Sequence, residues 1–279
     1  VSGESIPFVY HRELGDFKVR WIQSYGLERK HNFSGGYRSL IRTFVLPSET
    51  VRDHSTAALE EFQNQEMPFS EKAGMVYANY RFYTPTYHPK VDINSYAWTE
   101  DFRVGPSTET EFRFAHPAFG WSARYVEARA TADWGFDWED HLLNTGMGAV
   151  IRHQPEAPPA TIWVDRLWTV KVAYVLPSWG PVRFHIGGRF VRTSFDLDHG
   201  EEALGGNGSL RGYPSNFFRG PNLWTGNLEI RTKPLNLYSS HVGAAAFFDL
   251  GDAFETPEQI GVHGSVGLGL RVVFPQFNR

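Results

Sequence analysis

Hydrophobic and polar residues alternate with a period of two along most of this chain, which is typical of β-strands whose two faces meet different surroundings. The alternation is clearest in 161–174, 222–233 and 262–272. Further alternating segments lie at 17–25, 74–83, 89–98, 109–116, 123–134, 140–152 and 182–190, with a less regular one at 31–45. The pattern predicts about 12 or 13 strands. Many of them are longer than the roughly five or six residues usual in soluble proteins.

Alternation by itself fits a soluble β-sandwich as well as a transmembrane barrel. Strands long enough to cross a bilayer, at least about 9–11 residues, favour the barrel. So do aromatic residues near the predicted strand ends, where the two membrane interfaces would lie. These aromatic residues are Trp98, Trp121, Trp134, Trp163 and Tyr174. We therefore predict an all-β fold, a transmembrane antiparallel β-barrel.

In that barrel the two rows of each strand face lipid and lumen. The predicted lipid-facing residues of the C-terminal strands are Leu228, Ile230, Phe248, Val266, Leu268 and Leu270. The predicted lumen-facing residues are Glu127, Arg129, Asp165, Lys171, Arg183, His185 and Arg189. In 161–174 the apolar row runs through the even positions, Val164 included, and Arg166 interrupts it. A charged row also suits an ordinary solvent face.

Two kinds of segment interrupt the strands. Turn formers predict chain reversals at Pro106-Ser107, Pro117-Ala118, Pro158-Pro159, Pro177-Ser178 and Pro234-Leu235. Residues 53–66 carry helix formers behind a candidate N-cap at Ser55 or Thr56. They predict a short helix in a long loop, either a solvated surface helix or a plug or lid.

The amino-acid composition argues against several classes of function. The chain has 279 residues and no Cys, which excludes disulfides, thiolate zinc sites and Cys nucleophiles. Aromatic residues make up 15% of it, too many for a disordered chain, and a net charge of −4 gives no footprint for nucleic acid. The 11 His show no metal-binding spacing, and neither a G-x-S-x-G nor a dinucleotide motif is present. We predict no metal, no cofactor and no enzymatic activity.

The segment with the most specific chemistry is 204–231, LGGNGSLRGYPSNFFRGPNLWTGNLEIR. It predicts a long Gly-rich loop whose tip is Leu210-Arg211-Gly212-Tyr213. If this loop folds back into a lumen, Arg211 needs carboxylate partners. Glu229 and Asp249 share the parity of the charged rows and could supply them. The other interpretation is an exposed loop, with both acids on a solvent face.

This loop and the three segments after it resemble the C-terminal part of the BamA-type barrel superfamily, which covers outer-membrane assembly factors and two-partner-secretion transporters. The family loop has a tip of V/I/L-R-G-F/Y, matched by Leu210–Tyr213. The next family strand has a Glu before an apolar and a basic residue, matched by Glu229-Ile230-Arg231. An aromatic-x-Asp-x-Gly element then corresponds to 247–251, and a Gly-rich strand to 262–274. The resemblance covers about residues 200–275, and earlier residues match only in strand character.

The resemblance implies a 16-stranded barrel in the outer membrane of a Gram-negative bacterium, with the loop in the lumen. Together with the strand count above, about 12 to 16 strands are expected. Its latch site would consist of Arg211, Gly212, Tyr213, Glu229 and Asp249. We find no POTRA domain, and fewer strands than the family has at both ends. Residues 1–279 are therefore expected to be a single barrel domain without one or more terminal strands, as a fragment of a longer chain rather than a smaller relative.

The function implied by the resemblance is protein insertion or translocation. Expected partners are outer-membrane lipids and substrate or partner outer-membrane proteins, with periplasmic or lipoprotein accessory subunits as further candidates. The alternative is a passive pore or the membrane anchor of a surface or secreted protein. A third hypothesis is a soluble β-protein that binds carbohydrate through its aromatic residues.

Overall fold

The computed structural model describes residues 6–96, 98–155, 161–206 and 209–274. Within them, 13 strands form one antiparallel sheet. These strands are β1 (His11–Tyr25), β2 (Lys30–Val45), β3 (Glu71–Tyr83), β4 (Thr86–Val91), β5 (Thr99–Ala115), β6 (Tyr125–Trp138), β7 (His141–His153), β8 (Trp163–Val175), β9 (Val182–Ser194), β12 (Asn222–Thr232), β13 (Leu235–Leu237), β14 (Ser240–Phe254) and β15 (His263–Val273). A separate short pair consists of β10 (Glu202–Leu204) and β11 (Phe218–Gly220).

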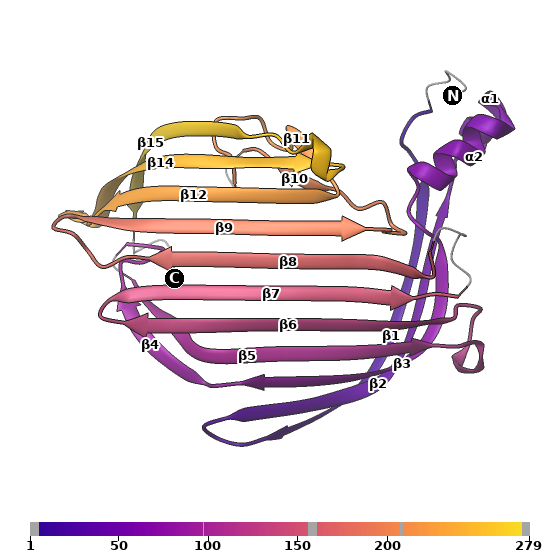
Figure 1. Ribbon diagram of the computed structural model, residues 1–279, viewed down its shortest axis with the longest axis horizontal. Coiled ribbons are helices and arrows are strands. Elements are labelled where there is room, and N and C mark those ends of the chain that lie inside the picture. The colour runs from indigo at the N-terminus through magenta and orange to yellow at the C-terminus, as the bar shows by residue number, and fades with distance from the viewer. Residues whose placement is uncertain (1–5, 97, 156–160, 207–208, 275–279) are drawn as a thin grey trace.

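The sheet is a meander in which strands that follow one another in the chain lie side by side (Figure 1). The predicted all-β antiparallel class is confirmed. So is the prediction that the segments at 222–233, 241–252 and 262–274 are adjacent antiparallel strands, since β14 pairs with β12 on one side and with β15 on the other. Their register places Leu228 opposite Phe248, and Phe248 opposite Val266. The outward row predicted from alternation is therefore continuous across three strands.

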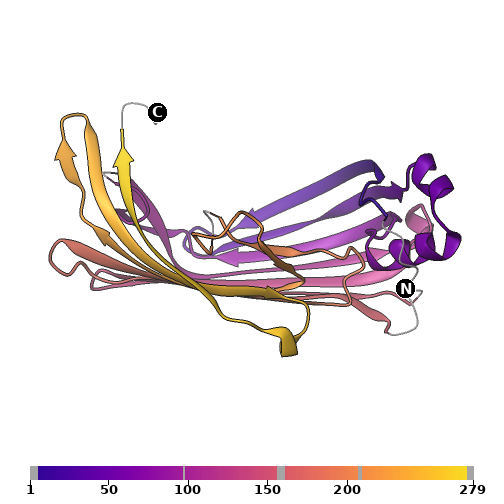
Figure 2. The same cartoon turned by 90° about the horizontal axis from the view of Figure 1, so that it is seen from above.

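Seen from above, the sheet is strongly curved and has a concave and a convex face (Figure 2). The strands at its two edges are β1 and β15, and over the described residues these two do not pair with each other. The described sheet is thus a curved wall whose two edge strands each have one free edge.

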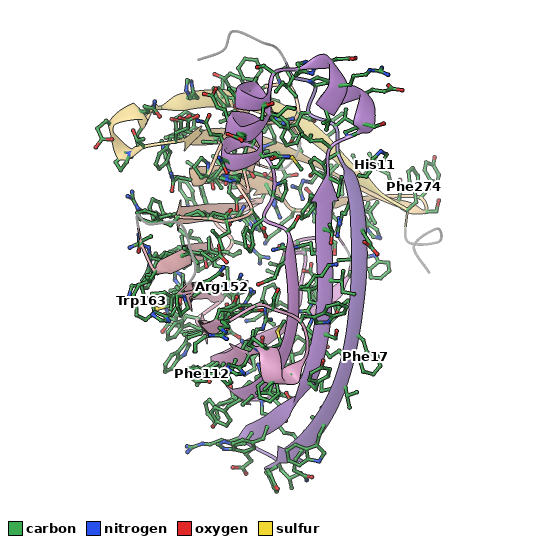
Figure 3. All side chains as sticks on the ribbon, turned by 90° about the vertical axis from the view of Figure 1, so that its right-hand side faces the viewer. His11, Phe17, Phe112, Arg152, Trp163 and Phe274 are labelled. Atoms are coloured by element: carbon green, nitrogen blue, oxygen red, sulfur yellow. The ribbon has the colours of Figure 1, made fainter. Side chains whose placement is uncertain are left out.

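The two faces of this wall differ in chemistry (Figure 3). Phe17, Phe112 and Trp163 lie on the outside, whereas Arg152 lies inside the curve and is buried. On β15 the outward residues Val266, Leu268 and Leu270 are 77%, 86% and 81% exposed. An apolar row so exposed to its surroundings requires a cover, because soluble proteins rarely leave apolar patches of more than a few hundred Å² in water.

One predicted facing is wrong. Val164 was placed in the outward row of β8, but it is buried and pairs with Arg152, an inward residue. The register shifts by one residue between this pair and the pair of Val150 with Leu167, and Asp165 has a φ of 49°. A β-bulge at Asp165 therefore exchanges the two faces of β8, so Val164 faces inward although Trp168 and Val170 face outward.

One predicted turn and the end of one predicted strand, both near residue 100, are also wrong. Pro106-Ser107 lies within β5, where Gly105 has a φ of 93°, and the strand bends there instead of reversing. Proline is tolerated at such an irregular point in a sheet. The predicted strand 89–98 ends at Val91, and the residues after it form a turn. Pro158-Pro159 lies outside the described residues.

The predicted helix at 53–66 is present as α2 (Thr56–Gln65), and the side chain of its N-cap Ser55 accepts a hydrogen bond from the amide of Ala58. A short helix, α1 (Ser48–Asp53), precedes it and was not predicted. Leu59 packs in a buried cluster with Leu46 and Met67. Both helices lie at one end of the sheet, beyond the strands (Figures 1 and 2). Two 3₁₀ turns, η1 (Pro117–Phe119) and η2 (Pro257–Gln259), complete the described helices.

The two ends of the sheet carry different connections. At the end with the helices the chain makes its long excursions, 46–70 and 195–221, and we call this the long-loop end. At the opposite end the connections include 26–29 and 139–140, and we call this the short-turn end. In the described part of the chain, no helix is both long enough and apolar enough to span a membrane.

Candidate functional site: a loop fixed to the concave face

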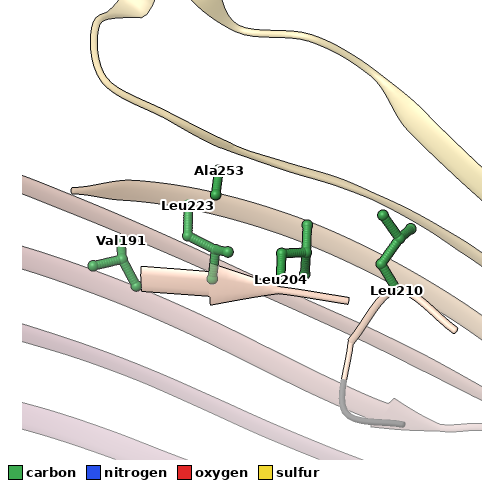
Figure 4. Close-up of a cluster of buried hydrophobic side chains, with 5 residues drawn as sticks. All are labelled: Val191, Leu204, Leu210, Leu223 and Ala253. Atoms are coloured by element: carbon green, nitrogen blue, oxygen red, sulfur yellow. The ribbon is translucent and has the colours of Figure 1, made fainter. Parts of the chain in front are cut away.

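The connection between β9 and β12 starts at the long-loop end and returns over the concave face of the sheet (Figure 2). Leu210, the first residue of its tip, is fully buried. It belongs to a hydrophobic cluster with wall and loop residues, namely Val191, Leu204, Leu223 and Ala253 (Figure 4). This apolar contact fixes the tip against β9, β12 and β14, so the residue after it is positioned over the polar row of these strands.

Arg211 is held by two carboxylates of the wall. Its Nε and Nη2 atoms donate to the two oxygens of Asp249, each at 2.7 Å, and its Nη1 donates to Glu229 Oε2 at 2.6 Å. The backbone amide of Arg211 also donates to Asp249 Oδ2, at 3.1 Å. A guanidinium that makes two parallel hydrogen bonds with one carboxylate is fixed in orientation as well as in position.

The pairing of β12 with β14 explains why the two acids lie close together. Asn227 is opposite Asp249 in the register, and Glu229 is two residues further along β12 on the same face. Asn227 Nδ2 donates to Asp249 Oδ1 at 3.0 Å and to the carbonyl of Ser209 at 2.9 Å, so it joins the acid to the loop backbone. Phe247, from the same row, lies under Arg211 with 3.7 Å between its ring centroid and the guanidinium carbon, a cation–π contact.

Glu229 is shared among three guanidinium groups. Its Oε1 accepts hydrogen bonds from Arg231 Nε and Arg271 Nη2, each at 2.6 Å, while Oε2 accepts from Arg211. The Asp249 side chain is fully buried, and that of Glu229 is 8% exposed. Buried carboxylates require such partners, since an unpaired charge in this position would be costly.

Gly212 and Tyr213 complete the tip. Gly212 has a φ of 93°, a conformation that favours glycine. A β-carbon built on Gly212 would lie at an ordinary distance of 3.6 Å from Ser265, so the backbone angle rather than crowding requires glycine here. The Tyr213 hydroxyl donates to the carbonyl of Gly264 at 3.4 Å, and its ring packs edge-on against Phe218. The tip therefore reaches β15 as well as β12 and β14.

The charge state of this site is fixed. The hydrogen bond to Asp249, opposed by partial burial and supported by the bond to Glu229, raises the pKa of Arg211 above its ordinary value. Arg211 therefore carries a positive charge near neutral pH. In the described part of the chain no group of three or more His, Asp or Glu residues could hold a metal ion. The arrangement can bind and release a loop, and we find no nucleophile and base placed together within it.

A second ionic cluster, which the sequence reasoning missed, lies on the opposite part of the concave face. Arg152 of β7 contacts Glu127, Asp165 and Glu71 at 2.9, 3.1 and 3.2 Å. Arg113 and Arg129 also bind Glu127. A cavity of about 430 Å³ adjoins this cluster. Glu127 and Asp165 were predicted to face inward, but Glu71 begins a strand far away in the sequence, and only the fold brings it to Arg152.

The base of the loop is attached to this second cluster. Asp198 pairs with Arg42 of β2, and the amide of Leu197 donates to Asp165 Oδ1 at 2.9 Å. The carbonyl of Leu197 accepts from the amide of Phe69 at 3.0 Å. The loop is thus fixed twice, at its base to β2 and β8 and at its tip to β12, β14 and β15, and it crosses the concave face between them.

The remaining residues predicted to face the lumen also have identified positions. Lys171 binds Asp133 at 2.8 Å, and Arg189 binds Glu202 of the loop at 3.1 Å. Arg183 contacts the turn after β4, and His185 lines a small cavity beside that turn. Arg271 contacts the latch site but was not predicted as part of it. It shares the inward parity of Ser265 in the alternating segment 262–272, and this parity could have identified it.

Fold and site together define a class: a curved antiparallel wall, apolar outside and charged inside, with a long loop fixed to its inner face. Comparison with protein families finds no matching family, and comparison with curated proteins finds no match. Among solved structures, CdiB from Escherichia coli aligns with 93% of this chain at 13% identity and a TM-score of 0.46. The aligned part is 46% of CdiB, so this chain spans about half the length of that protein.

Proposed function

We propose that this chain forms the wall of an outer-membrane β-barrel that translocates or inserts other proteins, with Leu210–Tyr213 as a latch between loop and wall. The observation that carries this proposal is the fork of Arg211 between Asp249 and Glu229 on the concave face. In an exposed Gly-rich loop the arginine would be solvated, and it would not be bound by two buried carboxylates. The motif order Leu-Arg-Gly-Tyr, Glu-Ile-Arg and Phe-Phe-Asp-Leu-Gly supports the same family of barrels.

The membrane location is supported by the convex face. Its apolar residues are exposed along whole strands, and lipid is the cover that such a face requires. Trp138, Trp163 and Tyr174 lie at or next to strand ends, where membrane interfaces would be. At the short-turn end Trp138 stacks on His141, with ring centroids 5.1 Å apart. By the usual arrangement of outer-membrane barrels, the long-loop end faces the exterior and the short-turn end the periplasm.

The partners follow from this placement. Outer-membrane lipids cover the convex face, and substrate proteins are the expected occupants of the lumen or of an exposed strand edge, where main-chain pairing can capture an extended segment. Accessory subunits would approach from the periplasmic end. The latch serves this function if it holds the loop while the pore is idle and releases it during transport.

A second candidate function is a passive pore or membrane anchor. The attachment of the loop base through Asp198 and Arg42 favours it, because a loop fixed at both ends makes a static constriction. In that case the latch would be structural, and its loss would change pore size without affecting any transport reaction.

The test compares wild type with Arg211→Ala and the conservative variant Arg211→Lys in liposomes. The probe is a small outer-membrane barrel protein, added unfolded, whose insertion is followed by its heat-modifiable gel migration. We expect wild type to accelerate insertion, Arg211→Ala to lose the acceleration while staying folded, and Arg211→Lys to retain part of it. Acceleration by Arg211→Ala equal to wild type would refute the latch. A protein that stays in solution without detergent would refute the membrane barrel.

A further inference from the structure

The short-turn end of the wall carries a second inward-folded segment, residues 92–96, which we call the inner turn. It follows β4, and both β3 and β4 pair with β5 on either side of the bend at Gly105. At this bend the Thr84 hydroxyl donates to the carbonyl of Val104 at 2.7 Å, and the Thr84 amide donates to Pro106 at 3.2 Å. The β4–β5 hairpin therefore leaves the line of the other strands and rises along the short-turn end of the sheet (Figure 1).

A single carboxylate fixes the conformation of the inner turn. Glu100 of β5 accepts hydrogen bonds from the backbone amides of Asn94 and Ser95 at 2.8 and 2.9 Å. It also accepts from the side chains of the same two residues, at 2.7 and 3.2 Å. Successive backbone N–H groups gathered on one anion leave the carbonyl groups of the turn available to other partners.

These carbonyl groups meet arginines from the far side of the sheet. Arg183 of β9 donates to the carbonyl of Asp92 at 3.0 Å, and Arg231 of β12 donates to that of Ile93 at 2.8 Å. Arg271 of β15 reaches the carbonyl of Asn94 at 3.5 Å. The turn is rooted on β5 and its contacts extend to β15, so it crosses the concave face rather than following the wall.

Two buried side chains hold the inner turn against the wall. Ile93 packs with Leu142 and Val175, near the short-turn ends of β7 and β8. Tyr96 lies over Gly243 of β14, where a β-carbon would come within 2.4 Å of the tyrosine oxygen. That oxygen is buried without a hydrogen-bond partner in the described residues. An unsatisfied buried hydroxyl weakens the closed arrangement and makes it easier to release.

The inner turn and the latch share one carboxylate. Arg231 and Arg271 bind the inner turn through one nitrogen and Glu229 Oε1 through another. The other oxygen of Glu229 binds Arg211. Release of Arg211 would therefore remove one of the three cations around the carboxylate that also binds the two arginines of the inner turn.

We propose that the inner turn is a plug that closes the lumen at the short-turn end, and that Glu229 couples its release to the release of Arg211. This inference rests on the proposed function, because a plug has meaning only in a membrane pore. It adds a second closure at the opposite end from the loop, and a defined route of communication between the two.

The test measures ion conductance of single pores in planar bilayers, in potassium chloride. The variants are Arg231→Gln, which removes one donor to the turn, and Tyr96→Ala, which removes the ring that packs on Gly243. The matched control is Lys171→Gln, which removes one inward cation that binds Asp133 of the wall instead. We expect the open fraction to rise about tenfold in both variants, equivalent to about 1.4 kcal/mol, and to stay within about twofold of wild type in the control.

A second measurement in detergent micelles follows hydrogen exchange of the Asn94 and Ser95 amides. Arg231→Gln should accelerate it at both positions, and Arg211→Ala should do so through Glu229. If wild type forms pores but Arg231→Gln and Tyr96→Ala behave as the control does, the plug is wrong. If no variant conducts, the proposed function fails, and unchanged exchange in Arg231→Gln then refutes the inner-turn contact independently. Unchanged exchange in Arg211→Ala alone refutes the coupling.

Discussion

Two ionic clusters on the concave face are built on opposite plans. At the latch, one carboxylate, Glu229, is shared by the three guanidinium groups of Arg211, Arg231 and Arg271. In the second cluster, one guanidinium, Arg152, is shared by three carboxylates from three strands, on Glu71, Glu127 and Asp165. Both solve the same problem, which is how to bury charge on the inside of a wall.

The clusters differ in what they hold together. Arg152 joins only sheet strands, and its side chain is 8% exposed. Arg211 joins a loop to the sheet, and its side chain is 24% exposed. Water can therefore replace the partners of Arg211 at lower cost than those of Arg152. We therefore expect the Arg152 cluster to maintain the wall and the latch to open without unfolding it.

The largest effect is expected for Arg152→Ala. Three buried acids would lose their common partner, and breaking such a cluster costs about 3–5 kcal/mol of unfolding free energy. Urea unfolding in detergent micelles measures it. Arg129→Ala is the control, because Arg129 binds the same Glu127 from a more exposed position and should cost only about 0–1 kcal/mol. Equal losses in the two variants would contradict a special role of Arg152.

A second prediction concerns the outer faces beside the two clusters. Leu268→Arg on β15 and Val170→Arg on β8 should each cost about 2–4 kcal/mol in lipid if the residue lies near the bilayer midplane. Both side chains are exposed on the convex face. Unfolding in lipid vesicles measures the cost. A change close to zero at both positions would mean that water, not lipid, covers this face.

Arg211→Ala should have a smaller effect on global stability, about 1.5–3 kcal/mol, since it removes charge-assisted hydrogen bonds to a loop. Its local effect should be large, with limited proteolysis cutting within 209–217 much faster than in wild type. Arg152→Ala should show the reverse order of effects. A variant Arg211→Ala that lowers the stability of the whole sheet as much as Arg152→Ala would remove the distinction between the clusters.

The smallest effect is expected for Gly212→Ala. A side chain at a φ of 93° is strained by about 1–2 kcal/mol, and nothing else at the tip is removed. Hydrogen exchange of the loop amides should accelerate while the unfolding midpoint of the sheet stays nearly constant. Gly269→Ala, at an inward position of β15 with open space around it, is the control. Undisturbed exchange in Gly212→Ala would show that the tip conformation is not strained.

The strands and the latch partners could be predicted because both depend on local parity. Glu229 and Asp249 fall in the charged rows, so pairing of β12 with β14 was enough to bring them together. The bulge at Asp165 could not be predicted, because it reverses parity without a clear turn signal. The inner turn was also missed, since its contacts join backbone carbonyls to arginines more than 90 residues away in sequence.

The sequence by itself determined the all-β class, the apolar and charged rows, and the inward parity of Glu229 and Asp249. These follow from period-two geometry, which links each residue to a face whatever the partner strand is. Only the tertiary structure decided that Glu71, Glu127 and Asp165 share Arg152, and that the inner turn and the latch meet at Glu229. Such contacts depend on the curvature of the sheet, which sets the distances across its concave face. The curvature does not alter the alternation of apolar and polar residues, so it cannot be seen in the sequence.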